Sequence, residues 1–287
     1  MKPLPDFVVV GGLRTGTTTL YSLLTQVPSI CMTEFKEPDF FLTDGSMSKG
    51  LDWYAGLFSD PDKVCGEVSP NYSSVDRFPG VAERIHSVSP DAKIIYVVRD
   101  PIDRLLSHYS QAWLQGDGLP DPDALKETPE GRHIIDGSRY YFQIEPYAKV
   151  FGADNIMVLE FRKMVADPHA TMRRVCEFVG APVTEEELAA ITIARKNSSR
   201  NLGSVPGWWT RMSDRIKKND SAIVRGVNRL IPRPLIRTVK GVVQATTEDR
   251  SPPDFTDDAK RAVKDALARD AQRLRDFTGK PFDHWKV

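Results

Sequence analysis

Short apolar runs alternate with segments of helical periodicity over much of the chain. The runs rich in β-branched residues cover residues 7 to 10, 64 to 68, 93 to 100 and 155 to 161. Helical spacing of apolar positions follows from about Thr17, over residues 81 to 88, from Pro101 and over residues 172 to 179. Nearly continuous apolar strands separated by helices are typical of a parallel sheet covered on both faces. The pattern predicts an α/β fold in three layers, with a central parallel sheet flanked by helices.

The clearest strand-to-helix unit is "KIIYVVRD" followed by "PIDRLLSHYSQAWL", residues 93 to 114. Pro101 suits a first helical turn, where its missing N–H costs no hydrogen bond. Apolar positions such as Ile102 and Leu105 then share one face of the helix. Clusters of Pro and Gly predict loops between residues 116 and 129 and in "SPPDF", residues 251 to 255.

Length and charge indicate one domain with an unusual segment. The 287 residues suffice for one sizeable core, and no internal repeat divides them, so we expect a single domain over residues 1–287. The 39 basic residues balance 39 acidic ones, so overall charge indicates no nucleic-acid partner. Residues 207–245 contain nine Lys or Arg against only Asp214 and Asp220. We expect a basic helical cap at about 205–245.

Cysteine usage and hydropathy bear on location. Cys31, Cys65 and Cys176 lack C-x-x-C spacing, which argues against a disulfide framework or a zinc site and fits a reducing compartment. The N-terminus has no stretch long enough for a signal-peptide core, and no apolar run reaches 18 residues. These features predict a cytoplasmic protein.

The stretch "FVVVGGLRTGTTTL", residues 7 to 20, has the composition of an anion-binding loop. A loop that leaves a buried strand and opens a helix presents free N–H groups at the positive end of the helix dipole. The spacing from Gly11 to Gly16 is that of the phosphate-binding loop G-x-x-x-x-G-K-[ST], but Thr17 stands at the lysine position and Arg14 lies inside the loop. The alternative is a plain turn whose threonines cap the helix.

The missing lysine favours a nucleotide used without a metal, because ATP chemistry uses that lysine to bridge the β- and γ-phosphates. Further donors in the loop are the hydroxyls of Thr15, Thr17, Thr18 and Thr19. At the next strand end Arg99 stands beside Asp100, which suggests a second anion contact there. The alternative for Arg99 is a surface ion pair with Asp100 or Asp103.

With these motifs the chain resembles the sulfotransferases that use 3'-phosphoadenosine 5'-phosphosulfate (PAPS), especially the branch that acts on carbohydrates. "GGLRTGTTTL" is similar to that family's 5'-phosphosulfate loop, and "VVRDPIDRLLSHYSQ", residues 97 to 111, to its 3'-phosphate motif. The weaker similarities lie in "KEPDFF" at 36 to 41, "KGLDWY" at 49 to 54, "GEVSPNY" at 66 to 72 and the C-terminal "RLRDFTGKPFDHW".

The resemblance implies a P-loop-like fold and roles for individual residues. It implies that PAPS is the sulfuryl donor, that no metal takes part, and that Gly16 and the loop threonines hold the 5'-phosphosulfate. Arg14 would lie over the leaving oxygen, where a fixed cation favours the transition state. Arg99 and Ser107 would hold the 3'-phosphate, and Arg200 or Lys196 would reach it from a closing loop.

Glu37 corresponds to the catalytic base of the resembled family. A carboxylate within reach of a sugar or alcohol hydroxyl can take its proton as the new bond forms. Considered alone, Glu37 beside Lys36 has the pattern of a solvated charge, and Glu34 is a nearby competitor. Asp39 and Val68 depart from the carbohydrate branch, which usually has His at the first position and in some members Lys at the second, so the acceptor's identity stays open.

The expected reaction is transfer of a sulfuryl group from PAPS to a hydroxyl of a carbohydrate or glycolipid, by in-line displacement. Partners would be a small-molecule, sugar or lipid-linked acceptor, and no nucleic acid. The basic segment 208–244 fits either peripheral contact with a membrane surface or a helix pair with a solvated basic face. The alternatives are a P-loop nucleotide or small-molecule kinase and a nucleotide-binding module without catalysis.

Overall fold

The computed structural model describes residues 4–116, 119–193 and 251–287, and its centre is a five-stranded sheet. The strands are β1 (Phe7–Gly11), β2 (Ile30–Met32), β3 (Val64–Val68), β4 (Lys93–Val98) and β5 (Ile156–Glu160). Their order is β2-β3-β1-β4-β5, and every neighbouring pair is parallel. All strands therefore end at the same edge of the sheet.

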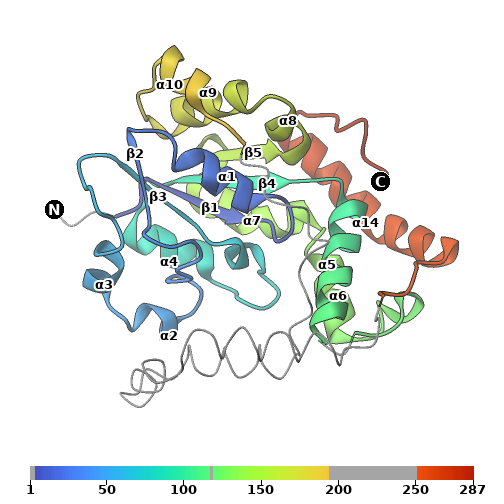
Figure 1. Ribbon diagram of the computed structural model, residues 1–287. Helices are drawn as coiled ribbons and strands as arrows, with labels where there is room; N and C mark the ends of the chain where they lie inside the picture. Colours follow the sequence, from blue (N-terminus) through green and yellow to red (C-terminus); the bar gives the residue numbers. More distant parts are fainter. Residues whose placement is uncertain (1–3, 117–118, 194–250) are drawn as a thin grey trace, which may run out of the picture.

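Helices cover both faces of this sheet, which gives three layers (Figure 1). Phe7 and Val9 of β1 pack in one apolar cluster, whereas Val8 and Val10 pack in the other. Both faces of the strand are thus buried, and this explains its uninterrupted apolar sequence. The first cluster contains residues of α1 (Thr17–Leu24), α9 (Pro168–Val179) and α10 (Glu185–Ala190). The second contains residues of α4 (Val81–Val88), α7 (Tyr140–Phe151) and α14 (Asp257–Thr278).

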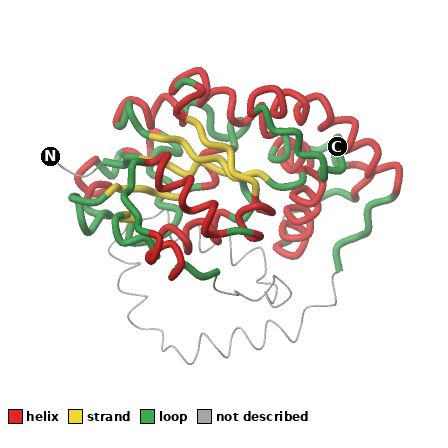
Figure 2. Tube along the Cα trace, turned by 90° about the horizontal axis from the view of Figure 1, so that it is seen from above, coloured by secondary structure: helices red, strands yellow, loops and turns green. Residues whose placement is uncertain are grey.

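A third apolar cluster joins α5 (Pro101–Gln115) and α6 (Pro129–Asp136) to the first half of α14. Seen from above, the strands run between layers of helices (Figure 2). The shorter elements are α2 (Asp44–Met47), α3 (Leu51–Ala55), η1 (Pro70–Ser73), η2 (Pro122–Ala124), η3 (Ala153–Asn155) and α8 (Phe161–Ala166). This arrangement confirms the predicted three-layer α/β fold.

The direction in which successive strands are added to the sheet reverses at β1. After β1 the chain builds β2 and β3 on one side of it, and then crosses to build β4 and β5 on the other side. In open parallel sheets, ligands bind outside the carboxyl ends of the strands at such a switch point. The segment after Gly11 and the residues that follow Val98 meet there.

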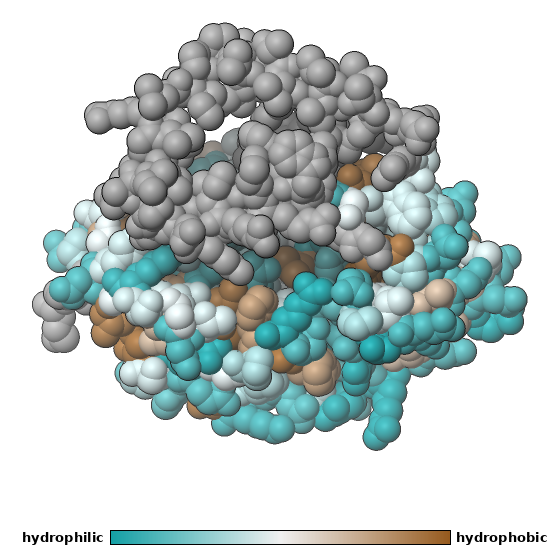
Figure 3. All heavy atoms as spheres, turned by 90° about the horizontal axis from the view of Figure 1, so that it is seen from below, coloured by the Kyte–Doolittle hydropathy of each residue, from teal (hydrophilic) through white to brown (hydrophobic). Residues whose placement is uncertain are grey.

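The expected cap at 205–245 lies outside the described residues, because the whole of segment 194–250 does. Within residues 4–116, 119–193 and 251–287, no helix combines the length and the hydropathy of a membrane-spanning segment. Figure 3 shows hydrophilic residues over much of one face, with hydrophobic groups between them. The large apolar side chains that are most exposed in the described part are Phe35, Leu51, Leu114 and Val165.

Candidate active site

The loop after β1 forms a cradle at the switch point. Gly16 has a φ of 95° and precedes α1, whose N-terminus has no side-chain capping hydrogen bond. A Cβ at Gly16 would come within 2.2 Å of the Phe161 ring, so only glycine fits both the backbone angle and the space. The uncapped first turn leaves helix N–H groups for a ligand, as an anion-binding loop requires.

The threonines of this segment differ in burial, and so in whether their hydroxyl groups are open to a ligand. Thr15 is fully buried, and its hydroxyl and its amide both donate to the carbonyl of Gly12, at 2.7 and 3.4 Å. Thr17 is buried as well, whereas Thr18 is exposed and Thr19 is half-buried. The side chain of Thr15 thus stabilises the loop itself, and the hydroxyls open to a ligand are those of Thr18 and Thr19.

Arg14, Ser107 and Arg99 gather beside the loop. Arg14 Nε donates to Ser107 Oγ at 3.2 Å, across 93 positions of sequence. Burial and then the positive charge of Arg99 lower the pKa of Arg14, so the two guanidinium groups lie near one another. Neither arginine pairs with a carboxylate in the described part of the chain. Two neighbouring cations without an acidic partner form a site for an anion.

The structure argues against a surface ion pair for Arg99. Asp100 is buried and caps α5, because its Oδ1 accepts from the Asp103 amide at 2.8 Å. Its Oδ2 accepts from the Lys286 amide at 2.7 Å, and Asp103 pairs with the Lys286 ammonium group. Both acidic residues that were alternatives for Arg99 therefore have other partners.

A second arginine of the same motif, Arg104, is fully buried and has a structural role. It donates from Nε to Ser138 Oγ at 2.7 Å and from Nη2 to the Ile134 carbonyl, which fixes α5 against the end of α6. Burial lowers its pKa to about 10. Burial and the charge of Arg104 also lower the pKa of His108, to about 2, so that this histidine is a very weak base.

Glu37 lies in the loop that follows β2, at the same edge of the sheet. Its amide donates to the Val68 carbonyl at 3.0 Å, which holds the loop against the end of β3. Its side chain is 43% exposed, and the carboxylate pairs with Lys36. Glu34, the competing glutamate, is exposed, and its amide bonds instead to the Leu57 carbonyl at 2.9 Å.

Backbone strain is concentrated in these two loops. Four non-glycine residues of the described chain have positive φ angles, and three of them are Arg14 at 64°, Glu37 at 64° and Asp39 at 51°. Such angles are uncommon for side-chain-bearing residues and persist where the surroundings hold them. Two of these three residues, Arg14 and Glu37, are the ones expected to act on donor and acceptor.

Two further carboxyl groups lie behind Glu37. Asp39 accepts from Asn71 at 3.0 Å through Oδ2, and its buried Oδ1 has no hydrogen-bond partner. Burial raises the pKa of Asp39 to about 6, with the charge of Glu37 adding to the rise and the hydrogen bond from Asn71 opposing it. Glu67 on β3 is fully buried among tyrosines such as Tyr54 and Tyr72, and burial raises its pKa to about 8, with Asp39 adding to the shift. A glutamate inside the apolar strand "VCGEV" was the sequence feature that could have indicated this group.

The raised pKa of Glu67 predicts a specific dependence of stability on pH. Native Glu67 keeps its proton up to about pH 8, whereas the unfolded chain releases it above its ordinary value of 4.5. Raising the pH from 5 to 8.5 therefore favours the unfolded chain, by about 1.4 kcal/mol for each pKa unit of difference. Glu67→Gln has no proton to lose at this position. Its free energy of unfolding should therefore rise relative to that of the wild type by about 2–4 kcal/mol between pH 5 and pH 8.5.

The measurement is urea unfolding of both proteins at pH 5, 7 and 8.5, and the quantity that counts is the difference between them. Glu34→Gln, at an exposed glutamate, is the matched control and should follow the wild type at each pH. A constant difference between Glu67→Gln and the wild type would mean that Glu67 is already ionised in the native protein at pH 5.

Other expected site residues are not described. Arg200 and Lys196 fall in residues 194–250, outside the described part of the chain. In residues 4–116, 119–193 and 251–287, no group of three or more His, Cys, Asp or Glu is arranged to hold a metal ion.

Comparison with known proteins agrees with an anion-binding site at this edge of the sheet. Residues 4–202 match the family model described as "Sulfotransferase domain". The chain belongs to the sulfotransferase domain family. Its fold is also that of a crystallised sulfotransferase from Alicyclobacillus acidocaldarius, with a TM-score of 0.56 and 23% identity over 77% of this chain and 98% of that one.

Two similar curated proteins have names that refer to heparan sulfate. Heparan sulfate glucosamine 3-O-sulfotransferase 3B1 of Mus musculus is 31% identical over 188 residues, which cover 62% of this chain and 47% of the relative. A bifunctional heparan sulfate N-deacetylase/N-sulfotransferase 4 of Mus musculus is 30% identical over 62% of this chain and 22% of the relative. The chain thus spans half or less of the length of these relatives.

Proposed function

We propose that this sulfotransferase-family chain transfers a sulfuryl group from PAPS to a hydroxyl of an acceptor. The observation that carries the proposal is the grouping of Arg14, Arg99 and Ser107 at the switch-point edge, beside the uncapped start of α1. Two arginines there suit a nucleotide with phosphate groups at both its 5' and 3' positions. The buried Thr17 at the lysine position disfavours the kinase alternative.

The cradle fits the 5' end of such a nucleotide. Thr18, Thr19 and the first-turn N–H groups of α1 would hold the 5'-phosphosulfate, and Arg99 with Ser107 would hold the 3'-phosphate. PAPS supplies the sulfuryl group and leaves as 3'-phosphoadenosine 5'-phosphate (PAP). Arg14 would neutralise the negative charge that grows on the departing phosphate, and as an arginine it keeps its proton while doing so.

Glu37 would act on the acceptor. As the acceptor oxygen bonds to sulfur and the bond from sulfur to the leaving phosphate breaks, the hydroxyl proton passes to the Glu37 carboxylate. Its partial exposure leaves that carboxylate accessible to an acceptor hydroxyl. Lys36, its partner in the structure, would release it when the acceptor binds.

Carbohydrate is the acceptor class that we propose, as a free sugar chain or a glycolipid. The names of the two heparan sulfate relatives support it, and so does an aromatic surface near Glu37. Phe35 is 44% exposed and its ring lies 6.5 Å from that of Trp53, with Lys49 Nζ 4.3 Å from the Trp53 centroid. Aromatic faces bordered by polar groups suit the apolar face and hydroxyl rim of a sugar.

Three wider features remain part of this proposal. Residues 1–287 would form one sulfotransferase domain, with the basic cap at about 205–245 near the acceptor or a membrane surface. A reducing, cytoplasmic location is the third, and the few cysteines of the chain, which lack C-x-x-C spacing, support it.

The proposal predicts that PAP stabilises the native protein without magnesium. A ligand at 100 times its dissociation constant adds about 2.7 kcal/mol, which corresponds to a rise of about 5–10 °C in melting temperature for a chain of this size. The measurement is a thermal shift of the full chain with PAP plus a chelator, beside ATP plus magnesium. A shift with ATP and magnesium alone would favour the kinase alternative. PAP binding without sulfuryl transfer to any acceptor would favour a binding module.

A further inference from the structure

The C-terminal tail, residues 280–287, contacts the strand end that carries Arg99. The amide of Lys286 donates to Asp100 Oδ2 at 2.7 Å, although the two residues are 186 positions apart. Because Asp100 Oδ1 caps α5, both oxygens of this buried carboxylate are occupied, one by the helix and one by the tail. The backbone at Asp100 is therefore fixed from two independent directions.

A second contact reaches Arg99 through a cluster of three aromatic rings. The buried Trp285 ring lies 4.2 Å from the Phe282 ring and 5.8 Å from the Tyr140 ring. The Tyr140 hydroxyl in turn accepts a hydrogen bond from the Arg99 amide at 3.4 Å. The tail thus supports Arg99 indirectly, through Tyr140. It supports Asp100, the neighbour of Arg99 in sequence, directly.

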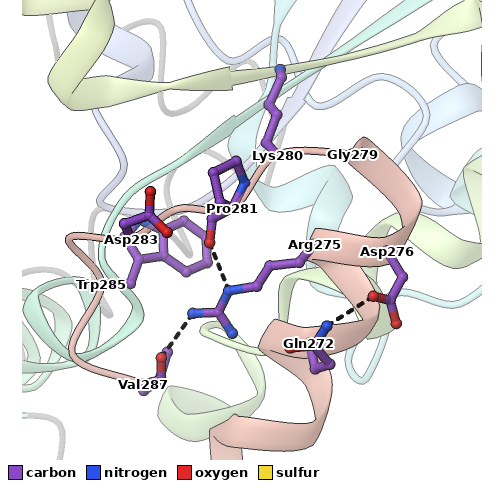
Figure 4. A pocket seen from close by; sticks show the side chains of 9 residues that line it. All are labelled: Gln272, Arg275, Asp276, Gly279, Lys280, Pro281, Asp283, Trp285 and Val287. Atoms are coloured by element: carbon purple, nitrogen blue, oxygen red, sulfur yellow. Dashed lines mark hydrogen bonds between the residues drawn. The ribbon is translucent and has the colours of Figure 1, made fainter.

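The tail is itself fixed to the body of the protein. Arg275 on α14 donates to the carbonyls of Pro281 and Val287, both at 2.8 Å, as Figure 4 shows. Lys280 Nζ donates to the carbonyl of Val158 on β5 at 2.6 Å. These bonds hold the tail at its first residues and at its last one. The anchored tail can therefore restrain the residues that follow β4.

We propose that Trp285 and Lys286 are positioning residues of the nucleotide site, which hold Asp100 and Tyr140 so that Arg99 stays close to Arg14. This inference rests on the proposed function, in which Arg99 binds the 3'-phosphate. The physical need is electrostatic. Arg14 and Arg99 repel one another in the absence of the nucleotide's phosphates, and the tail contacts hold the backbone at Arg99 and Asp100 against this repulsion. Support from the tail prepares the site before the nucleotide binds.

The test separates the Lys286 amide from the Lys286 side chain. Lys286→Pro removes the N–H that Asp100 accepts, whereas Lys286→Ala keeps it and removes only the exposed ion pair with Asp103. Affinity is measured by calorimetry for PAP and for adenosine 5'-phosphate, which lacks the 3'-phosphate. We expect Lys286→Pro to lose about tenfold in PAP affinity and to stay within about twofold on adenosine 5'-phosphate, because a charge-assisted contact carries a factor of this size.

Two further variants keep the outcome decisive. Lys286→Ala should stay within about twofold of the wild type on both ligands. Asp100→Asn retains one acceptor oxygen and cannot serve both amides, so it should reproduce the selective loss even if Lys286→Pro does not fold. Equal losses on both nucleotides, or no loss, in the folded variants would overturn the positioning role. A wild type that does not prefer PAP to adenosine 5'-phosphate would instead contradict the proposed function.

Discussion

Glu37→Gln is expected to lower turnover by roughly 10² to 10⁴ while leaving nucleotide affinity within about twofold. The glutamine keeps the shape of the side chain and part of its hydrogen bonding, but it cannot accept a proton from the acceptor hydroxyl. Nucleotide binding should hardly change, because Glu37 lies in the loop after β2, held to β3 through the Val68 carbonyl, and not in the loop that carries Arg14. The measurements are steady-state transfer of radiolabelled sulfate to an acceptor found by screening, and calorimetry with PAP.

Glu34→Gln is the matched control for this experiment. It makes the same chemical change three residues earlier, at an exposed glutamate whose amide contacts a different strand connection, and it should leave turnover close to the wild-type value. Near-normal turnover in Glu37→Gln would contradict the assignment of the base. Asp39 would then be the next residue to substitute, because its charge is coupled to that of Glu37 and its Oδ1 has no partner.

The fold was predictable where local pattern and burial coincide. β3 and α4 have the bounds that periodicity gave, and α5 begins at Pro101 as its sequence requires. β2 was missed because three residues are too few to show a period. α7 was missed because Pro146 lies inside it and aromatic residues occupy several of its faces, so its sequence has no simple stripe. α14 buries only a narrow apolar stripe along a mostly charged helix, which weakens the pattern.

Local sequence motifs could indicate only the part of the site that is formed by residues close together in sequence. The spacing of the first loop and Arg99 at the next strand end indicated an anion site, the resemblance added Ser107, and the structure brings Arg14 to Ser107. The bond from the tail to Asp100 joins residues 186 positions apart, and no local pattern contains such a contact. The coupling of Asp39 to Glu67 depends on burial against the sheet, which is a property of the folded chain.

Arg14→Ala is expected to behave differently from Glu37→Gln, since it should lower both turnover and nucleotide affinity. The Arg14 guanidinium would touch the donor before and during transfer, so its loss weakens ground-state binding and also removes charge stabilisation of the transition state. We expect about a tenfold loss in PAP affinity and a fall of roughly 10² to 10³ in turnover. Part of the loss in PAP affinity comes from Ser107, because its Oγ loses the 3.2 Å hydrogen bond from Arg14 Nε.

Two variants distinguish a specific role of Arg14 from a general loss of positive charge. Arg261→Ala removes an exposed arginine on α14 that pairs with Asp258, and it should leave affinity and turnover within about twofold of the wild type. Arg14→Lys keeps the cation but has no Nε to hold Ser107, so it should recover much of the turnover and less of the nucleotide affinity. The measurements are the same transfer assay and PAP calorimetry. An Arg14→Ala protein with reduced turnover and unchanged PAP affinity would mean that the cation acts only as the bond to the leaving group breaks, and Arg14 would then have no part in holding the bound nucleotide.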